Sequence, residues 1–218
     1  MHRGSRGWPH RRNLWHSCSQ QRFLKMYKPW IGPNYPETQL LILGESAYPW
    51  AENGKSVCPS PEHSTECAIW ASCDFERCRT SNRFLTAVSR ALANEESPTT
   101  DQLRAAWDRI AFTNFVSETV GEYLARPTPA MWAAAKRVFL PQLSEFFGSR
   151  PKPRRIIVIG KGIWKSMPDA DIQIDAGVKG YRLADHIVMC FALPHTRAGL
   201  SWRQLANVVS SSGNAVSG

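Results

Sequence analysis

Four short apolar runs, each ending in a polar residue, are the clearest pattern along the chain. They lie at about 39–43, 110–115, 156–159 and 187–193. Short continuous apolar runs are typical of strands that are buried on both faces of a parallel sheet. Segments with helical spacing separate the runs, so strands and helices alternate. The pattern predicts an α/β fold, a three-layer α/β/α domain with a central four-stranded parallel sheet.

Periodic apolar positions and end signals predict the helices between these strands. The expected helices cover about 82–93 and 199–209, a long segment from Pro129 to Gly148, and short segments that begin at Pro98 and Gly160. Proline is favoured in the first turn of a helix, and glycine just past its end. Because parallel strands share one carboxyl edge, we expect the polar residues that follow the four strands to meet there.

Positive charge is concentrated at the N-terminus. The 218-residue chain has 27 Lys and Arg against 18 Asp and Glu, a formal charge of +9. Residues 1–30 contain no acid and the cations Arg3, Arg6, Arg11, Arg12, Arg22, Lys25 and Lys28. With Trp8 and Trp15, this composition suits phosphates and unpaired bases, so we expect a DNA-contacting arm; a solubilising tail is the alternative. The domain is predicted over 31–212, with a tail at 213–218.

The other composition signals concern compartment and cofactors. No apolar stretch approaches the roughly 20 residues of a membrane span, so we expect a cytoplasmic protein without a membrane partner. Four of the six cysteines crowd into one stretch with His63; they are Cys58, Cys67, Cys73 and Cys78. Such ligands could hold zinc or an iron-sulfur cluster, but the usual Cys-x2-Cys spacing is missing. We therefore expect free thiols and no cofactor.

Four segments share their order with the motifs of a known enzyme family. They are Gly44-Glu45-Ser46-Ala47-Tyr48, Thr113-Asn114, Ile156–Lys161 and Leu193-Pro194-His195-Thr196-Arg197. This order resembles that of the uracil-DNA glycosylase superfamily over about residues 39–205. The resemblance implies a monomeric, monofunctional DNA glycosylase that flips a modified or deaminated pyrimidine, hydrolyses its N-glycosidic bond and leaves an abasic site.

The resemblance implies a role for three of these residues in holding the base. His195 would donate a hydrogen bond to a base carbonyl and stabilise the departing anion. Asn114 would read the pyrimidine edge, which its amide can match with one acceptor and two donors. Tyr48 would form a wall against the base. Their positions also fit a helix-capping histidine, a turn-forming asparagine and a core tyrosine.

Position 46 departs from the family pattern. Much of the family has Asp or Asn there to hold the attacking water, whereas this chain has Ser46, followed by Ala47 in place of a usual proline. A serine hydroxyl is a poor base at neutral pH without a partner. We therefore expect the neighbouring Glu45, which matches an acid in one branch of the family, to be catalytic, with Ser46 helping to place the water.

Three further residues are predicted to contact DNA. Lys161, between two glycines at a helix start, is expected to lie at a phosphate contact. Arg197 would pair with a phosphate or fill the gap left by the flipped nucleotide, and Leu200 would be a wedge between bases. Both also fit as ordinary loop residues.

The biological setting and one rival function stay open. The enzyme would act in base excision repair or against phage DNA that carries modified cytosines. The rival is a catalytically inactive DNA-binding member of the same fold, which the serine at position 46 favours. An unrelated nucleotide-binding α/β protein ranks last, because the chain lacks the glycine-rich phosphate loops of that class.

Overall fold

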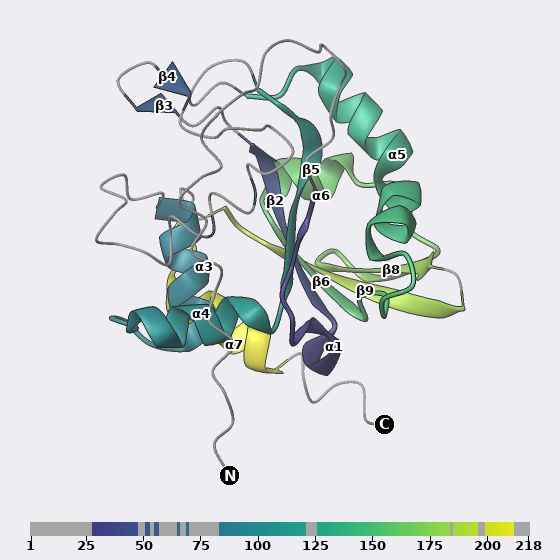
Figure 1. Ribbon diagram of the computed structural model, residues 1–218. Helices are drawn as coiled ribbons and strands as arrows, with labels where there is room; N and C mark the ends of the chain where they lie inside the picture. Colours follow the sequence, from purple (N-terminus) through teal and green to yellow (C-terminus); the bar gives the residue numbers. More distant parts are fainter. Residues whose placement is uncertain are drawn as a thin grey trace.

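A seven-stranded mixed sheet forms the centre of the molecule (Figure 1). The computed structural model describes residues 28–47, 51–52, 55–56, 65, 69, 83–120, 126–183, 185–195 and 199–211. The sheet has the strand order β1-β5-β2-β6-β9-β8-β7. Its strands are β1 (Trp30–Ile31), β2 (Leu40–Ala47), β5 (Ala111–Thr119), β6 (Arg155–Ile159), β7 (Ile172–Asp175), β8 (Val178–Leu183) and β9 (His186–Leu193). A separate two-stranded pair consists of β3 (Ala51–Glu52) and β4 (Lys55–Ser56).

The four predicted strands form one contiguous parallel block within this sheet. The block runs β5-β2-β6-β9, and each neighbouring pair in it is parallel. The predicted parallel arrangement is therefore confirmed, but the prediction of a four-stranded sheet is wrong. Short β1 adds to β5 in antiparallel orientation, and β8 and then β7 extend the sheet beyond β9, also antiparallel. None of these three added strands carries the buried apolar run on which the prediction rested.

Helices cover both faces of the sheet, which confirms the three-layer arrangement (Figure 1). On one face lie α5 (Pro129–Phe147) and α6 (Lys161–Ser166), and on the other lie α3 (Arg83–Ala93), α4 (Thr100–Asp108) and α7 (Trp202–Ser211). The single turn α1 (Tyr35–Thr38) precedes β2. In the described ranges, no helix is long and apolar enough to cross a membrane.

Local sequence signals set the helix ends where they were expected. Thr99 and Gln102 form a capping box at the start of α4, and the Thr128 hydroxyl accepts a hydrogen bond from a backbone amide of α5, whose first residue is Pro129. Gly148 ends α5 with φ +48°, a conformation that glycine adopts at little cost. These ends fix the lengths of the covering helices and therefore the positions of the loops at the sheet edge.

Candidate active site at the carboxyl ends of the parallel strands

Strands β2 and β5 continue beyond their neighbours at the carboxyl edge of the parallel block. The β2–β6 ladder ends at the Leu43–Val158 pair, whereas the β2–β5 ladder continues through Gly44–Asn114 and Ser46–Val116 before its register shifts. Both strands are longer than the apolar runs at about 39–43 and 110–115 predicted, because mutual pairing extends them through Ala47 and Thr119. The first motif therefore lies within β2, apart from Tyr48, and Asn114 lies inside β5 rather than close to its end.

Asn114 lies directly across from Gly44, and this pair defines one side of the candidate site. A Cβ atom at position 44 would lie 2.6 Å from Asn114 Oδ1 and 3.2 Å from Phe112 Cζ. The first distance is too short for a real Cβ contact. Glycine at position 44 therefore leaves the space in which the carboxamide of Asn114 lies against β2, and a larger residue would require that amide to move. The half-buried Asn114 thus presents its donors and acceptor from a fixed place on the sheet.

His195 follows β9 and lies on the same face of the sheet as Asn114. The backbone N–H of Gly160 donates to the carbonyl of Leu193 at 2.9 Å, which ties the ends of β6 and β9 together. The half-buried His195 ring stacks on Phe84 of α3, with ring centroids 5.7 Å apart and planes 22° apart. Phe84 in turn contacts Phe112 at a centroid distance of 6.1 Å. The two ring contacts therefore link His195, through Phe84, to Phe112, which lies beside Gly44 as Asn114 does.

Glu45 lies on the face of the sheet opposite Gly44 and Asn114, because side chains alternate along a strand. It faces the helices α5 and α6: a Cβ atom at Gly162 would lie 3.8 Å from Glu45 Oε2 and 3.7 Å from the ring of Trp132. Ser46 pairs with Val116 in the last part of the β2–β5 ladder, just before its register shifts. The carboxylate of the first motif therefore lies away from the face where Asn114 and His195 lie.

The Ser46 hydroxyl is a buried polar group with unused hydrogen-bonding capacity. The residue is 9% exposed, and within the described part of the chain its Oγ has no hydrogen-bond partner. An unsatisfied buried hydroxyl costs about 1–3 kcal/mol, a cost that a bound water or substrate atom would remove. This position in the strand therefore suits a group that orients a small polar molecule.

Of the other predicted site residues, Lys161 and Leu200 are described by the structure, and Tyr48 and Arg197 are not. Lys161 is exposed at the first position of α6. Leu200 is only 7% exposed and belongs to the apolar cluster under α3 and α7, so it packs in the core in this conformation. Tyr48 and Arg197 lie outside the described residues, as do residues 1–27 and the four clustered cysteines Cys58, Cys67, Cys73 and Cys78 with His63. Among the described side chains, no three His, Cys, Asp or Glu residues come together as metal ligands.

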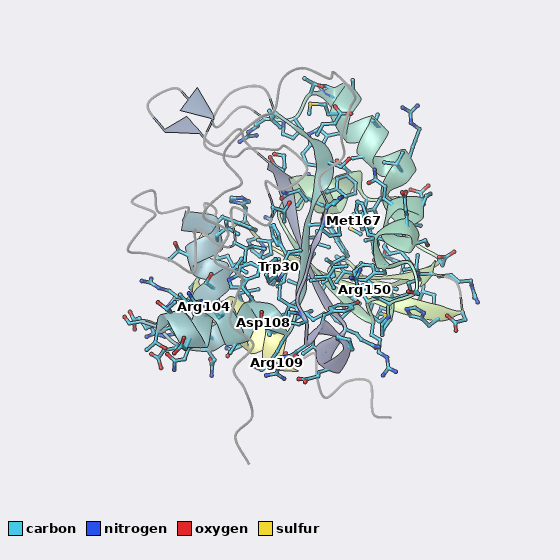
Figure 2. All side chains as sticks on the ribbon, in the orientation of Figure 1. Trp30, Arg104, Asp108, Arg109, Arg150 and Met167 are labelled. Atoms are coloured by element: carbon cyan, nitrogen blue, oxygen red, sulfur yellow. The ribbon has the colours of Figure 1, made fainter. Side chains whose placement is uncertain are left out.

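A half-buried acid at the other end of the sheet, Asp108, is separate from this site. Burial raises the pKa of the Asp108 carboxyl, and the neighbouring Arg104 opposes that shift. Figure 2 shows Asp108 and Arg109 together at the lower end of the sheet, where β5 begins. The candidate site lies at the opposite, carboxyl ends of the strands, so Asp108 takes no part in it.

Two aromatic residues that the structure adds to the site, Phe84 and Trp132, have the sequence pattern of core residues. Phe84 and Trp132 occupy apolar positions of predicted helices, and nothing in that periodicity separates a site residue from a core residue. Their contacts with His195 and with the surroundings of Glu45 arise only when α3 and α5 pack against the sheet. The steric role of Gly44 was likewise hidden, because it depends on the register between β2 and β5.

The fold and site define an α/β/α protein whose polar residues gather at the carboxyl edge of a parallel block. No model of a known protein family matches the chain, and no curated protein matches it. A functional interpretation therefore depends on the four motif segments and on the placement of Asn114 and His195 on one face.

Proposed function

We propose that the protein is a monofunctional DNA glycosylase that flips a modified or deaminated pyrimidine and hydrolyses its N-glycosidic bond to leave an abasic site. It would act in base excision repair or against phage DNA with modified cytosines. The observation that carries the proposal is the convergence of Asn114 and His195, from strands far apart in sequence, on one face of one sheet edge. That edge is where open α/β sheets bind ligands.

In the proposed reaction the bond between C1′ of the sugar and the base nitrogen breaks, and the bonding electrons leave with the base. Asn114 hydrogen-bonds the pyrimidine edge, and an N–H of His195 donates to a base carbonyl whose negative charge grows as the bond breaks. Water adds its oxygen to C1′, and its proton passes to solvent or to the released base. A strongly dissociative reaction needs little activation of that water, so a hydroxyl such as Ser46 suffices to place it.

Glu45 and Lys161 have supporting places in this proposal. The carboxylate of Glu45 lies on the α5 and α6 side, beside Trp132 and Gly162. From there it would act on the sugar of the flipped nucleotide. Lys161 is exposed at the start of α6 and would contact a DNA phosphate. Tyr48 and Arg197 keep their predicted roles as base wall and DNA contact.

The test is release of a free base from defined DNA. Oligonucleotides with uracil or with heavily modified cytosines are incubated with the protein, released base is identified by mass spectrometry, and abasic sites by alkaline cleavage. His195→Ala should slow release by at least about 100-fold, because it removes a donor to the developing anion, while DNA binding is kept. His186→Gln is the matched control, since His186 bonds Asp185 and the Pro153 carbonyl away from the site.

A second candidate is a DNA-binding protein of the same fold without catalytic activity. It is favoured by the first motif, in which Ser46 stands where much of the resembling family has Asp or Asn, and the Glu45 carboxylate lies on the face opposite Asn114. This candidate predicts tight binding of damaged or abasic DNA with no base released from any substrate. His195→Ala would then weaken binding itself, whereas the glycosylase proposal predicts that binding survives.

A further inference from the structure

We infer that Phe84 is a positioning residue that sets the plane of the His195 imidazole. The inference deepens the proposed function and rests on it, because a fixed imidazole plane matters only if His195 donates to a substrate. It assigns a task to the first turn of α3, a segment that none of the four motifs includes.

The contact between the two rings has the geometry of an offset stack. Their centroids are 5.7 Å apart, and the planes differ by 22°. Aromatic rings prefer such arrangements, and a stack opposes rotation of either ring about the bond that joins it to its Cβ. His195 is one residue beyond Pro194, after β9 has ended, so its side chain is oriented by what it touches rather than by a strand ladder. Phe84 supplies a flat surface at that point.

Phe84 is itself held by a closed circuit of contacts through three elements. The indole N–H of Trp107 in α4 donates to Ser89 Oγ of α3 at 2.9 Å, and both residues are buried. Trp107 packs edge-on against Phe112 of β5, with centroids 5.9 Å apart. Phe112 then contacts Phe84 of α3, which closes the circuit. Since α3 appears twice in this circuit, its first turn has a defined position relative to β5.

The same circuit connects the two residues that would hold the base. Phe112 lies beside Gly44 on the face where Asn114 sits, and Phe84 carries the contact on to His195. A shift of α3 would therefore change the angle between the His195 N–H and the Asn114 amide. Donors that are misaligned with the developing charge lose much of their effect on the rate. We conclude that the stack aligns the imidazole with the base rather than only filling space.

The experiment compares Phe84→Leu and Phe84→Tyr with the wild-type protein. Phe84→Leu removes the flat ring and should lower the maximal rate of base release by roughly tenfold or more, with the KM for DNA little changed. Phe84→Tyr keeps the ring and should restore most of the rate. Phe146→Leu is the matched control, because Phe146 is also a half-buried helical phenylalanine but packs on the opposite face of the sheet. Thermal unfolding of each variant shows whether it is folded.

A second readout is independent of catalysis. The ring-proton NMR signals of His195, assigned by their loss in His195→Gln among the six histidines of the chain, should move in Phe84→Leu and stay in place in Phe146→Leu. Unchanged signals, or a rate in Phe84→Leu equal to that of the control, would overturn the inference. If the wild-type protein releases no base from any DNA, the proposed function fails, and the NMR signals still decide whether the Phe84 ring lies against the imidazole.

Discussion

The parallel centre of the sheet and its antiparallel flank use similar residues in opposite ways. In β6 the residues Ile156 to Ile159 are at most 1% exposed, and helices cover both faces. In the flank formed by β7 and β8, every residue of β7 is exposed, and Ile174 is 61% exposed. Isoleucine is thus a core residue in one strand and a surface residue in the other, because the covering helices end before they reach the edge of the sheet.

This difference in packing matches the location of the candidate site. All of the candidate site residues that the structure places come from the centre or from segments that follow its strands, where close packing fixes side chains. The flank is joined to the centre through β9, with the buried residues Tyr181 and Cys190 at the junction. We therefore expect substitutions in the centre to change both stability and activity, and matching substitutions in the flank to change little.

The largest difference is expected between two identical isoleucine substitutions. Ile157→Ala removes a fully buried side chain from β6 and should lower the free energy of unfolding by about 2–5 kcal/mol. Ile174→Ala changes an exposed residue of β7 and should lower it by less than about 0.5 kcal/mol. Urea unfolding measures both. Equal losses would show that the flank is as tightly integrated as the centre.

The next comparison uses one glycine from each region. A Cβ atom at Gly44 would lie 2.6 Å from Asn114 Oδ1, so Gly44→Ala should displace the amide, lower the free energy of unfolding by about 1–3 kcal/mol and slow base release by about 100-fold. A Cβ atom at Gly180 in β8 would lie 3.2 Å from atoms of Ile172 and Ile187, whose side chains are partly exposed.

We expect Gly180→Ala to leave base release unchanged, because β8 lies in the flank and contributes no residue to the candidate site. The rate of base release and the urea midpoint are measured on both variants. A normal rate in Gly44→Ala would mean that the position of the Asn114 amide is not important for the reaction. In that case the contact between position 44 and Asn114 would affect only the free energy of unfolding.

The last effect is expected at the junction of the two regions and appears only at high pH. Burial raises the pKa values of the Cys190 thiol and the Tyr181 hydroxyl in the folded state. Both groups are therefore held neutral in the folded protein. Their contribution to the free energy of unfolding is complete below their unfolded pKa values of about 8.5 and 10, and it is lost as the pH rises further. The free energy of unfolding should fall above about pH 8.5, by up to about 1.4 kcal/mol per pH unit for each group.

Tyr181→Phe tests this assignment. The variant loses the hydrogen bond from the Tyr181 hydroxyl to the Pro168 carbonyl, 2.7 Å long, and should be less stable by about 1 kcal/mol at pH 7. Its stability should then fall less steeply than that of the wild-type protein above about pH 10. Urea unfolding between pH 7 and 10.5 measures both slopes. Parallel curves would exclude Tyr181 as a source of the alkaline loss.

Most of the central fold was predictable from sequence, because its elements carry strong local signals. The apolar runs of β2, β5, β6 and β9 and the periodic stripes and caps of α3, α4, α5 and α7 exceed anything in the flank. In contrast, β7 and β8 alternate polar and apolar residues over short, partly exposed segments. Strand β8 forms because β9 offers it a hydrogen-bonding edge, and β7 then pairs with β8. Such pairing between strands is not visible in the local sequence.

The candidate site was likewise predictable from the sequence only in part. The apolar runs separated by helical segments predicted parallel strands, and the shared carboxyl edge of such strands made Asn114 and His195 candidates for one site. Three features of the site appear only in the folded structure: Gly44 makes room for Asn114, Glu45 faces α5 and α6, and Phe84 stacks on His195. These outcomes depend on strand register and helix packing, which arise from contacts between residues distant in the chain.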